Sequence, residues 1–240
     1  MKKIAVLTAL LFAALQIGYA QKVGLVLSGG GAKGAAHIGV IKALEENGIP
    51  IDYITGTSAG AIVGSLYAMG YTPEEMVELM LSEEFSYWQT GTVENEYKYY
   101  FKRPDPTPEF GHFSIDMTDS LQVKASFLPQ SLINPIQMNQ AFMALFSQAT
   151  AKAGWNFDNL FVPFRCVASD IYSKKAIIFK NGDLGDAVRA SMTFPFFFQP
   201  IWKDSVPIFD GGIYDNFPVG PMKEAFHPDF IFGSTVAGGN

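Results

Sequence analysis

The sequence has few residues suited to metal or disulfide chemistry. It contains one cysteine, Cys166, among 240 residues, and its three histidines, His37, His112 and His227, are far apart in the chain. One cysteine forms neither an internal disulfide nor a cysteine-rich zinc site, and these histidines lack the spacing of zinc ligands. The sequence therefore predicts no metal site and no disulfide-stabilised scaffold.

Charged residues are also scarce, and their balance is acidic. They make up 17% of the chain, with 17 Lys and Arg against 23 Asp and Glu, for a net charge of −6. Proteins that bind nucleic acid neutralise phosphates with basic residues, so this balance argues against a nucleic-acid partner. With 48% apolar residues, the chain is too hydrophobic for a disordered protein and fits one globular domain.

The apolar run near the N-terminus is too short for a membrane-spanning helix. Lys2 and Lys3 precede 14 residues, 4–17, that carry no charge, and the small residues Gly18 and Ala20 follow. A spanning helix needs about 20 such residues. The pattern predicts a signal peptide over residues 1–20, cleaved after Ala20, and a mature domain over residues 21–240 with a net charge of −8. An uncleaved N-terminal membrane anchor is the alternative.

The mature sequence opens with alternating strand and helix patterns. Residues 23–27 form a short apolar run, residues 35–47 carry apolar side chains at helical spacing, residues 53–55 form a second apolar run, and an apolar helix extends to about residue 69. This alternation predicts a mostly parallel sheet covered by helices on both faces, a three-layer α/β/α fold.

Further elements follow with less regular spacing. Thr72 and Glu75 form a capping-box pattern that predicts a helix start, and a helix is expected from Asn134 or Pro135 to about Lys152. Further strands are expected over residues 162–168, 176–179, 206–209 and 230–236. Residues 85–113, rich in aromatics, Gly and Pro, show no clean period and are interpreted as an irregular insertion.

A Gly-x-Ser-x-Gly pattern between the second strand and its helix is the first sign of chemistry. It consists of Gly56, Thr57, Ser58, Ala59 and Gly60. Such a pattern at a strand-to-helix turn raises a serine hydroxyl above the sheet edge, where it can act as a nucleophile. The amide that follows the serine would lie at a helix N-terminus, which favours an anion. The alternative is a small-residue joint without chemistry.

A glycine-rich loop after the first strand is expected at the same sheet edge. It comprises Gly29, Gly30, Gly31, Ala32, Lys33 and Gly34. Backbone amides in such a loop can stabilise an oxyanion, and Lys33 is either part of this loop or a solvated helix-start residue. The spacing also matches a dinucleotide-binding fingerprint, but the acidic residue expected at the end of the second strand is missing, because Asp52 precedes that strand.

A nucleophilic serine needs a base, and none of the histidines is well placed. His37 lies one turn into the first helix, where a structural role is the better interpretation. Asp210 is a stronger candidate because it follows an apolar strand and precedes Gly211 and Gly212, which allow close approach of another loop. An ordinary Asp-Gly-Gly turn is the alternative.

These three motifs, in this order, resemble those of the patatin-like phospholipase family, particularly its secreted bacterial members. The resemblance also includes Ala190-Ser191 and the segment 215–218, and it extends over about residues 23–236. It implies a three-layer fold, hydrolysis of lipid acyl esters, no cofactor, and a catalytic dyad of Ser58 as nucleophile and Asp210 as base. The amides of Gly29, Gly30 and Gly31 are then the expected oxyanion hole.

The resemblance also implies a phospholipid or another acyl ester as substrate, and a lipid interface as partner. Some secreted bacterial relatives continue into an outer-membrane domain, so the chain is expected to be truncated at its C-terminal end and to be periplasmic, outer-membrane-associated or secreted. A dinucleotide-dependent oxidoreductase and an inactive lipid-binding module are the alternative functions.

Two aromatic clusters have an open interpretation. Phe194, Phe196, Phe197 and Phe198 either line a groove for an acyl chain or belong to the core. The aromatics of residues 85–113, which lie beside Lys98, Lys102 and Arg103, either form a lid or lipid-contacting segment or contribute plain packing.

Overall fold

The computed structural model describes residues 21–92, 112–116, 122–126 and 131–238. The predicted signal peptide and the basic and aromatic residues 97–103 lie outside these ranges. The main sheet contains β1 (Val23–Leu27), β2 (Tyr53–Thr57), β5 (Phe164–Asp170), β6 (Lys175–Phe179), β7 (Ile201–Lys203), β8 (Val206–Asp210) and β9 (Phe230–Ser234). A separate antiparallel pair contains β3 (His112–Asp116) and β4 (Gln122–Ser126).

Seven α-helices lie in the described part of the chain. They are α2 (Ala36–Glu46), α3 (Ala59–Ala68), α4 (Pro73–Leu81), α5 (Glu83–Thr90), α6 (Ile136–Lys152), α7 (Leu184–Ser191) and α8 (Val219–Phe226). Three short 3₁₀ turns accompany them, namely η1 (Gly31–Ala35), η3 (Phe157–Asn159) and η4 (Gly211–Ile213). No helix in these ranges is both long enough and apolar enough to cross a membrane.

The main sheet is mixed, with parallel and antiparallel parts. Its order is β7-β8-β5-β2-β1-β9, and β6 also pairs with β5. Strands β5, β2, β1 and β9 are parallel, as predicted, whereas β6, β7 and β8 are antiparallel to their neighbours. The prediction of a mostly parallel sheet is therefore corrected for β6, β7 and β8. Short turns at residues 171–174 and 204–205 join these strands, and such turns connect only antiparallel strands.

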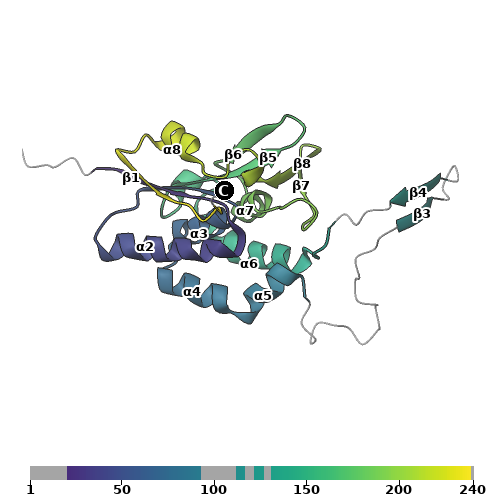
Figure 1. Cartoon of the computed structure of the whole chain (residues 1–240), viewed down its shortest axis with the longest axis horizontal. Helices are drawn as coiled ribbons and strands as arrows, with labels where there is room; N and C mark the ends of the chain where they lie inside the picture. The colour runs from purple at the N-terminus through teal and green to yellow at the C-terminus, as the bar shows by residue number, and fades with distance from the viewer. Residues whose placement is uncertain (1–20, 93–111, 117–121, 127–130, 239–240) are drawn as a thin grey trace, which may run out of the picture.

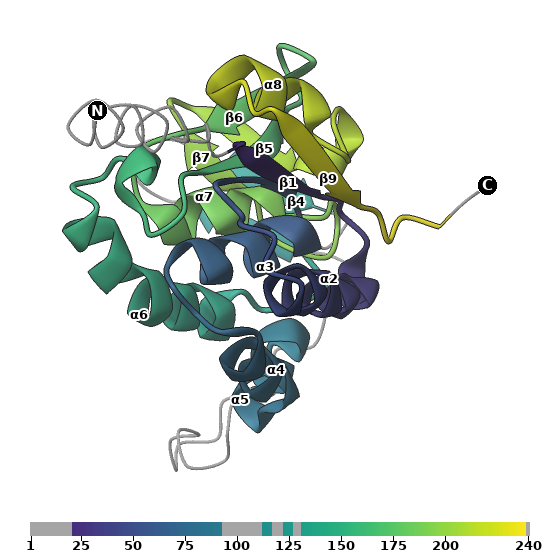
Figure 2. The ribbon, with the colours of Figure 1, turned by 90° about the vertical axis from the view of Figure 1, so that its left-hand side faces the viewer.

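Helices cover both faces of the sheet, which confirms the predicted three layers. Figure 1 shows α8 on one face and α2, α3 and α6 on the other, with α4 and α5 beyond them. The view in Figure 2, turned by 90°, shows the same arrangement. Leu25, Leu27 and Ile54 on β1 and β2 are fully buried between these layers. Their continuous apolar runs fit strands that have helices on both sides.

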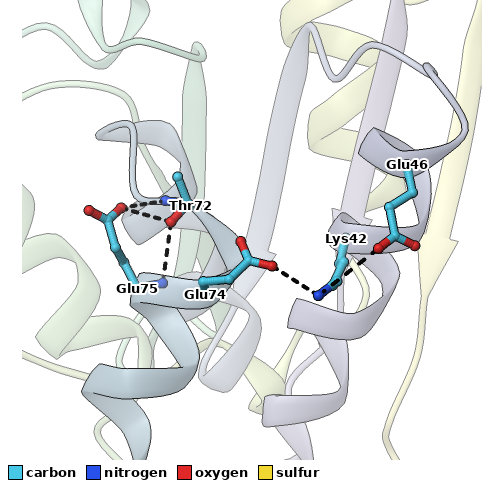
Figure 3. Close-up of polar contacts among 5 residues, drawn as sticks. All are labelled: Lys42, Glu46, Thr72, Glu74 and Glu75. Atoms are coloured by element: carbon cyan, nitrogen blue, oxygen red, sulfur yellow. Dashed lines mark hydrogen bonds and ion pairs between the residues drawn. The ribbon is translucent and has the colours of Figure 1, made fainter.

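The predicted capping box at the start of α4 is confirmed. The amide of Glu75 donates to the Thr72 hydroxyl at 3.2 Å, and the Thr72 amide donates to the Glu75 carboxylate at 2.8 Å (Figure 3). Lys42 on α2 pairs with Glu74 at 2.9 Å and joins the two helices. Both of these side chains are largely exposed, so solvent screening keeps this contribution small.

The interpretation of residues 85–113 as irregular is wrong at both ends. Residues 85–90 belong to α5, which Ser82 caps by accepting from the Phe85 amide at 3.2 Å, and β3 begins at His112. The helix ends at Gly91, whose φ of 69° is left-handed. On α5, Trp88 packs edge-to-face on Phe142 of α6. This tertiary contact joins α5 to α6.

Candidate functional site

The site forms where two strands end beside one another on β5. On β2, Thr57 is opposite Val167, and on the antiparallel β8, Asp210 is opposite Ala168. Strand β6 occupies the other edge of β5 along residues 166–170. Since a strand has two edges, β2 and β8 share one edge and run toward each other. Their ends therefore meet at adjacent residues of β5, which brings the residue after Thr57 next to Asp210.

The two predicted site residues are in direct contact. The Ser58 hydroxyl donates to Oδ2 of Asp210 at 2.6 Å, and the Gly212 amide donates to Oδ1 at 2.7 Å. Asp210 is only 7% exposed. Burial raises the pKa of its carboxyl, and the two hydrogen bonds oppose this rise because they stabilise the charged form. The pair combines a hydroxyl with a desolvated carboxylate acceptor.

Glycines make the turn at Ser58 possible. Ser58 has φ 53° and ψ −118°, a conformation that a non-glycine residue adopts only when its surroundings enforce it. A Cβ on Gly56 would overlap the carbonyl of Gly60, and a Cβ on Gly60 would overlap the carbonyl of Leu27. Strand β2, helix α3 and strand β1 therefore pack backbone to backbone, which fixes the strained serine.

Glycine is also required after the aspartate. A Cβ on Gly211 would overlap the carbonyl of Val167 on β5. A Cβ on Gly212 would lie 2.8 Å from Oδ1 of Asn216 and 3.0 Å from Oδ1 of Asp210. The Asp-Gly-Gly segment is thus a close approach of this loop to β5 and to the carboxylate, rather than only an exposed turn.

The glycine-rich loop lies beside Ser58, but its amides are not equivalent. The Gly29 amide donates to the Asn216 carbonyl at 3.1 Å, so it is not free to bind an oxyanion in this conformation. Within the described ranges the amides of Gly30 and Gly31 have no acceptor, and both residues line the cavity described below. Gly34 packs against Ala59, whereas Lys33 is exposed and does not line the cavity.

Asn216 is a site residue to which sequence reasoning gave no role. In addition to accepting from Gly29, it directs its side-chain amide toward the Gly29 carbonyl, at 3.4 Å. It therefore connects the loop after β8 to the glycine-rich loop after β1. The segment 215–218 was part of the family resemblance, but an Asn in a loop has no local pattern that reveals a distant partner.

A largely apolar cavity of about 880 Å³ opens beside the pair. It is lined by Ser58 and Asp210, by the glycine loop, and by side chains of α3, α4, α5, α6 and the segment after α7. The large apolar side chains among them are Ile62, Met80, Phe85, Trp88, Met138, Phe142, Met192, Phe194, Phe197, Phe198 and Ile213. Three of the four phenylalanines, Phe194, Phe197 and Phe198, therefore line the cavity, as one of their two interpretations holds, and Phe85 and Trp88 at the start of the 85–113 segment line it too.

Within the described part of the chain, neither His37 nor His227 is hydrogen-bonded to Ser58, whose hydroxyl donates to Asp210. His37 is fully buried, with Nδ1 2.7 Å from the Ser234 hydroxyl and Nε2 2.9 Å from the Ser28 carbonyl, and burial lowers its pKa. This geometry confirms its structural interpretation. His227 is exposed and ends α8 with φ 47°. His112 belongs to β3.

The acidic residue that a dinucleotide site would need has another role. Asp52 precedes β2, accepts from the Val23 amide at 2.8 Å and pairs with Lys22 at 2.7 Å. It therefore lies at the opposite end of β2 from Ser58. Among the described residues, no three His, Cys, Asp or Glu side chains are grouped so that they could hold a metal ion.

Comparisons with known proteins agree with this geometry. The chain is 31% identical over 217 residues to lysophospholipase NTE1 of Pyricularia oryzae, and 29% identical over 203 residues to the patatin-like phospholipase domain-containing protein ZK370.4 of Caenorhabditis elegans. These alignments cover 90% and 84% of this chain but 12% of each relative's length.

A solved structure shows the same fold. The crystal structure of VipD from Legionella pneumophila matches with a TM-score of 0.54 and 17% identity, over 89% of this chain and 49% of VipD. The family model "Patatin-like phospholipase" matches residues 25–223, which include the glycine-rich loop 29–34, Ser58 and the Asp210-Gly211-Gly212 segment. The chain therefore belongs to the patatin-like phospholipase family.

Proposed function

We propose that this chain is a serine lipid acyl hydrolase that cleaves acyl esters of phospholipids or lysophospholipids. The observation that carries the proposal is the 2.6 Å hydrogen bond from the Ser58 hydroxyl to the buried Asp210 carboxylate, at the wall of an apolar cavity. The names of the relatives, lysophospholipase and phospholipase domain-containing protein, support the same reaction class.

In the proposed mechanism, Ser58 attacks the ester carbonyl while Asp210 accepts its proton. The carbonyl oxygen becomes an oxyanion, which the free amides of Gly30 and Gly31 stabilise. Asp210 then returns the proton to the departing alcohol or lysophospholipid, and an acyl-serine ester remains. Water, deprotonated by the same carboxylate, attacks this ester, and Asp210 returns the proton to the Ser58 oxygen as the fatty acid is released. Every step uses groups of this chain.

The cavity supplies the binding energy for the acyl chain. Moving an acyl chain from a bilayer into water costs about 0.8 kcal/mol per CH₂. The enzyme avoids this cost only if an apolar environment replaces the lipid around the chain. Side chains from α5 and α6, with Phe194, Phe197 and Phe198, provide that environment beside Ser58. The proposed substrate is therefore an ester with a long acyl chain.

Fatty-acid release distinguishes this proposal from its alternatives. We expect release from a defined phosphatidylcholine, from a lysophosphatidylcholine or from both, and from a short-chain ester, all unchanged by EDTA. A dinucleotide-dependent oxidoreductase would instead bind NAD(P) and release no fatty acid. An inactive lipid-binding module would bind liposomes without turnover or labelling by a fluorophosphonate. Either of these outcomes would overturn the proposal.

We also propose that phenylalanines at the cavity rim contact the lipid surface. Phe196 is 71% exposed, and the neighbouring Phe194 and Phe197, which line the cavity, are about half exposed. Exposed aromatics near a lipid site lower the cost of moving substrate from membrane to enzyme. The aromatic and basic residues 97–103, for which sequence analysis expected the same role, lie outside the described residues.

Phe196→Ser is expected to lower turnover on liposomes at least about threefold and to leave hydrolysis of a soluble short-chain ester within about twofold, because burial of one Phe contributes about 1.5–3 kcal/mol. Phe161→Ser is the matched control, since Phe161 is 75% exposed but precedes β5, at the sheet end away from Ser58. Equal losses on both substrates would show that Phe196 only supports the fold.

We further propose export through residues 1–20, as in secreted bacterial members of the family. The support is the sequence pattern of two lysines, an apolar run and small residues before Gln21. Expression of the full chain in a bacterium should yield a mature protein whose N-terminus, by mass spectrometry, is Gln21. A product that retains residues 1–20 would favour the membrane-anchored alternative.

A further inference from the structure

We propose that Ser191, the last residue of α7, is a positioning residue that fixes the backbone of Ser58, and that the short segment 191–193 at the end of α7 sets the separation of Ser58 and Asp210. The inference rests on the proposed function. It assigns Ser191, which lies outside the cavity lining and does not touch the reacting hydroxyl, a role in the reaction that acts through the nucleophile's backbone.

The backbone amide of Ser58 needs a hydrogen-bond acceptor from outside its own strand and helix. Strand β2 ends at Thr57 and helix α3 begins at Ala59, so neither element supplies an acceptor for the Ser58 amide. Ser191 supplies it, because its Oγ accepts from this amide at 2.9 Å. Ser191 is fully buried, so water is not available as a replacement.

Ser191 also fixes its own hydroxyl. Its Oγ–H donates to the Val167 carbonyl on β5 at 2.6 Å. The hydroxyl is thus an acceptor toward Ser58 and a donor toward β5, so both hydrogen bonds together fix its orientation. Val167 is opposite Thr57 in the sheet, so this bridge holds the turn at Ser58 to the strand that both ends of the site share.

The same segment holds the second site residue two positions later. The Asp210 amide donates to the Thr193 carbonyl at 2.8 Å. Residues 191 and 193 therefore bind the backbones of Ser58 and Asp210, respectively. A shift of this segment would change the position of both, and small errors in the approach of reacting groups cost large factors in rate.

A buried arginine holds the segment in place. Arg189 donates to the Thr193 hydroxyl at 2.6 Å, to the Asn139 side chain at 3.0 Å and to the Gln199 carbonyl at 3.2 Å. Its guanidinium lies 5.1 Å from the ring centroid of Phe198, a cavity residue. Burial lowers the Arg189 pKa to about 10, which leaves the side chain charged at neutral pH. Through Arg189, hydrogen bonds therefore connect segment 191–193 to α6, and a cation–π contact connects it to the cavity wall at Phe198.

Ser191→Ala tests the inference, with a soluble short-chain ester as substrate. We expect kcat to fall about 10- to 100-fold, since the buried Ser58 amide loses its acceptor, and KM to stay within about threefold. The rate of labelling by a fluorophosphonate should fall by a similar factor. Ser191→Thr, which keeps the hydroxyl, should recover most of both.

Ser65→Ala is the matched control. Ser65 is a fully buried serine on α3 whose hydroxyl donates only to the helix carbonyl of Ile62, at 2.9 Å. Ser65→Ala should keep kcat within about twofold, because it removes a buried serine hydroxyl without changing the partners of Ser58. If Ser191→Ala keeps the kcat and labelling rate of Ser65→Ala, the inference is wrong.

Ser191→Cys provides a second test if the alanine variant does not fold. Its thiol fills the same space but is a weak donor and acceptor, so a folded variant with reduced kcat supports the inference and one with wild-type kcat overturns it. Failure of the proposed function is a separate outcome, because the wild type would then show neither turnover nor labelling.

Discussion

Ser58→Ala is expected to abolish acyl ester hydrolysis. The variant lacks the oxygen that would form the acyl-enzyme, and loss of a serine nucleophile in enzymes of this type costs at least about 10³-fold in kcat. Only binding and the oxyanion amides would remain. Fatty-acid release and fluorophosphonate labelling measure the effect, and the label on the wild type should map to Ser58 by peptide mass spectrometry.

The fold of this variant is expected to survive. The Ser58 amide still donates to Ser191, and alanine meets the same backbone strain as serine at φ 53°. The side chain loses one hydrogen bond, to Asp210, which costs about 1–3 kcal/mol at a buried site. A thermal melt should therefore show one cooperative transition with a modestly lower Tm. Hydrolysis at the wild-type rate by this variant would refute the serine mechanism.

The first half of the fold could be predicted from sequence because its signals are local. Strand β1 is fully buried and β2 is buried except for the half-buried Tyr53. Glycines 29–31 after β1 mark the turn into η1, and Gly56 and Gly60 on either side of Ser58 mark the turn into α3. The second half could not be predicted in the same way. The apolar run of β8 indicates a strand but not its direction, which depends on the two-residue turn at Asp204 and Ser205, both with positive φ.

The site residues also differ in whether the sequence could reveal them. Ser58 and Asp210 are flanked by glycines that the close packing of backbones requires, so their motifs are visible in the sequence. Asn216 and Ser191 act over 187 and 133 residues of sequence separation, through single hydrogen bonds. A lone polar residue in a loop or at a helix end is common, and only the packed structure reveals its partner.

Asp210→Asn is expected to lower kcat at neutral pH at least about 10²-fold, because an amide cannot accept the Ser58 proton. The variant should remain folded. Asparagine keeps one oxygen as an acceptor for the Gly212 amide, and its NH₂ group can donate to the Ser58 oxygen.

The raised pKa of Asp210 also predicts how Asp210→Asn changes stability. Burial raises the folded-state pKa of Asp210 above its unfolded value of about 3.9, so the folded state holds the proton more tightly than the unfolded state. This carboxyl therefore favours the fold when protonated and loses that contribution as the pH rises through its folded pKa. The neutral asparagine removes the cost of a buried charge, so its Tm at pH 7 should equal or exceed that of the wild type.

The same pKa sets the acidic limb of the activity profile. The proposed base works only when it is ionised, so kcat of the wild type should fall as the pH drops through the folded-state pKa, at a higher pH than for an exposed aspartate. The residual activity of Asp210→Asn should lack this limb. A wild-type profile that stays flat down to about pH 4, near the ordinary pKa of aspartate, would contradict the assignment of Asp210 as base.

Asp215→Asn is the matched control, because burial also raises the pKa of Asp215, while its carboxylate accepts a hydrogen bond from the backbone of Phe217 and not from Ser58. Asparagine keeps an acceptor for that bond, so kcat should stay within about threefold. His227→Ala should also keep activity, since His227 is exposed at the end of α8. If Asp210→Asn kept wild-type kcat while a folded histidine variant lost it, the base would be a histidine, and the buried carboxylate would only orient the serine.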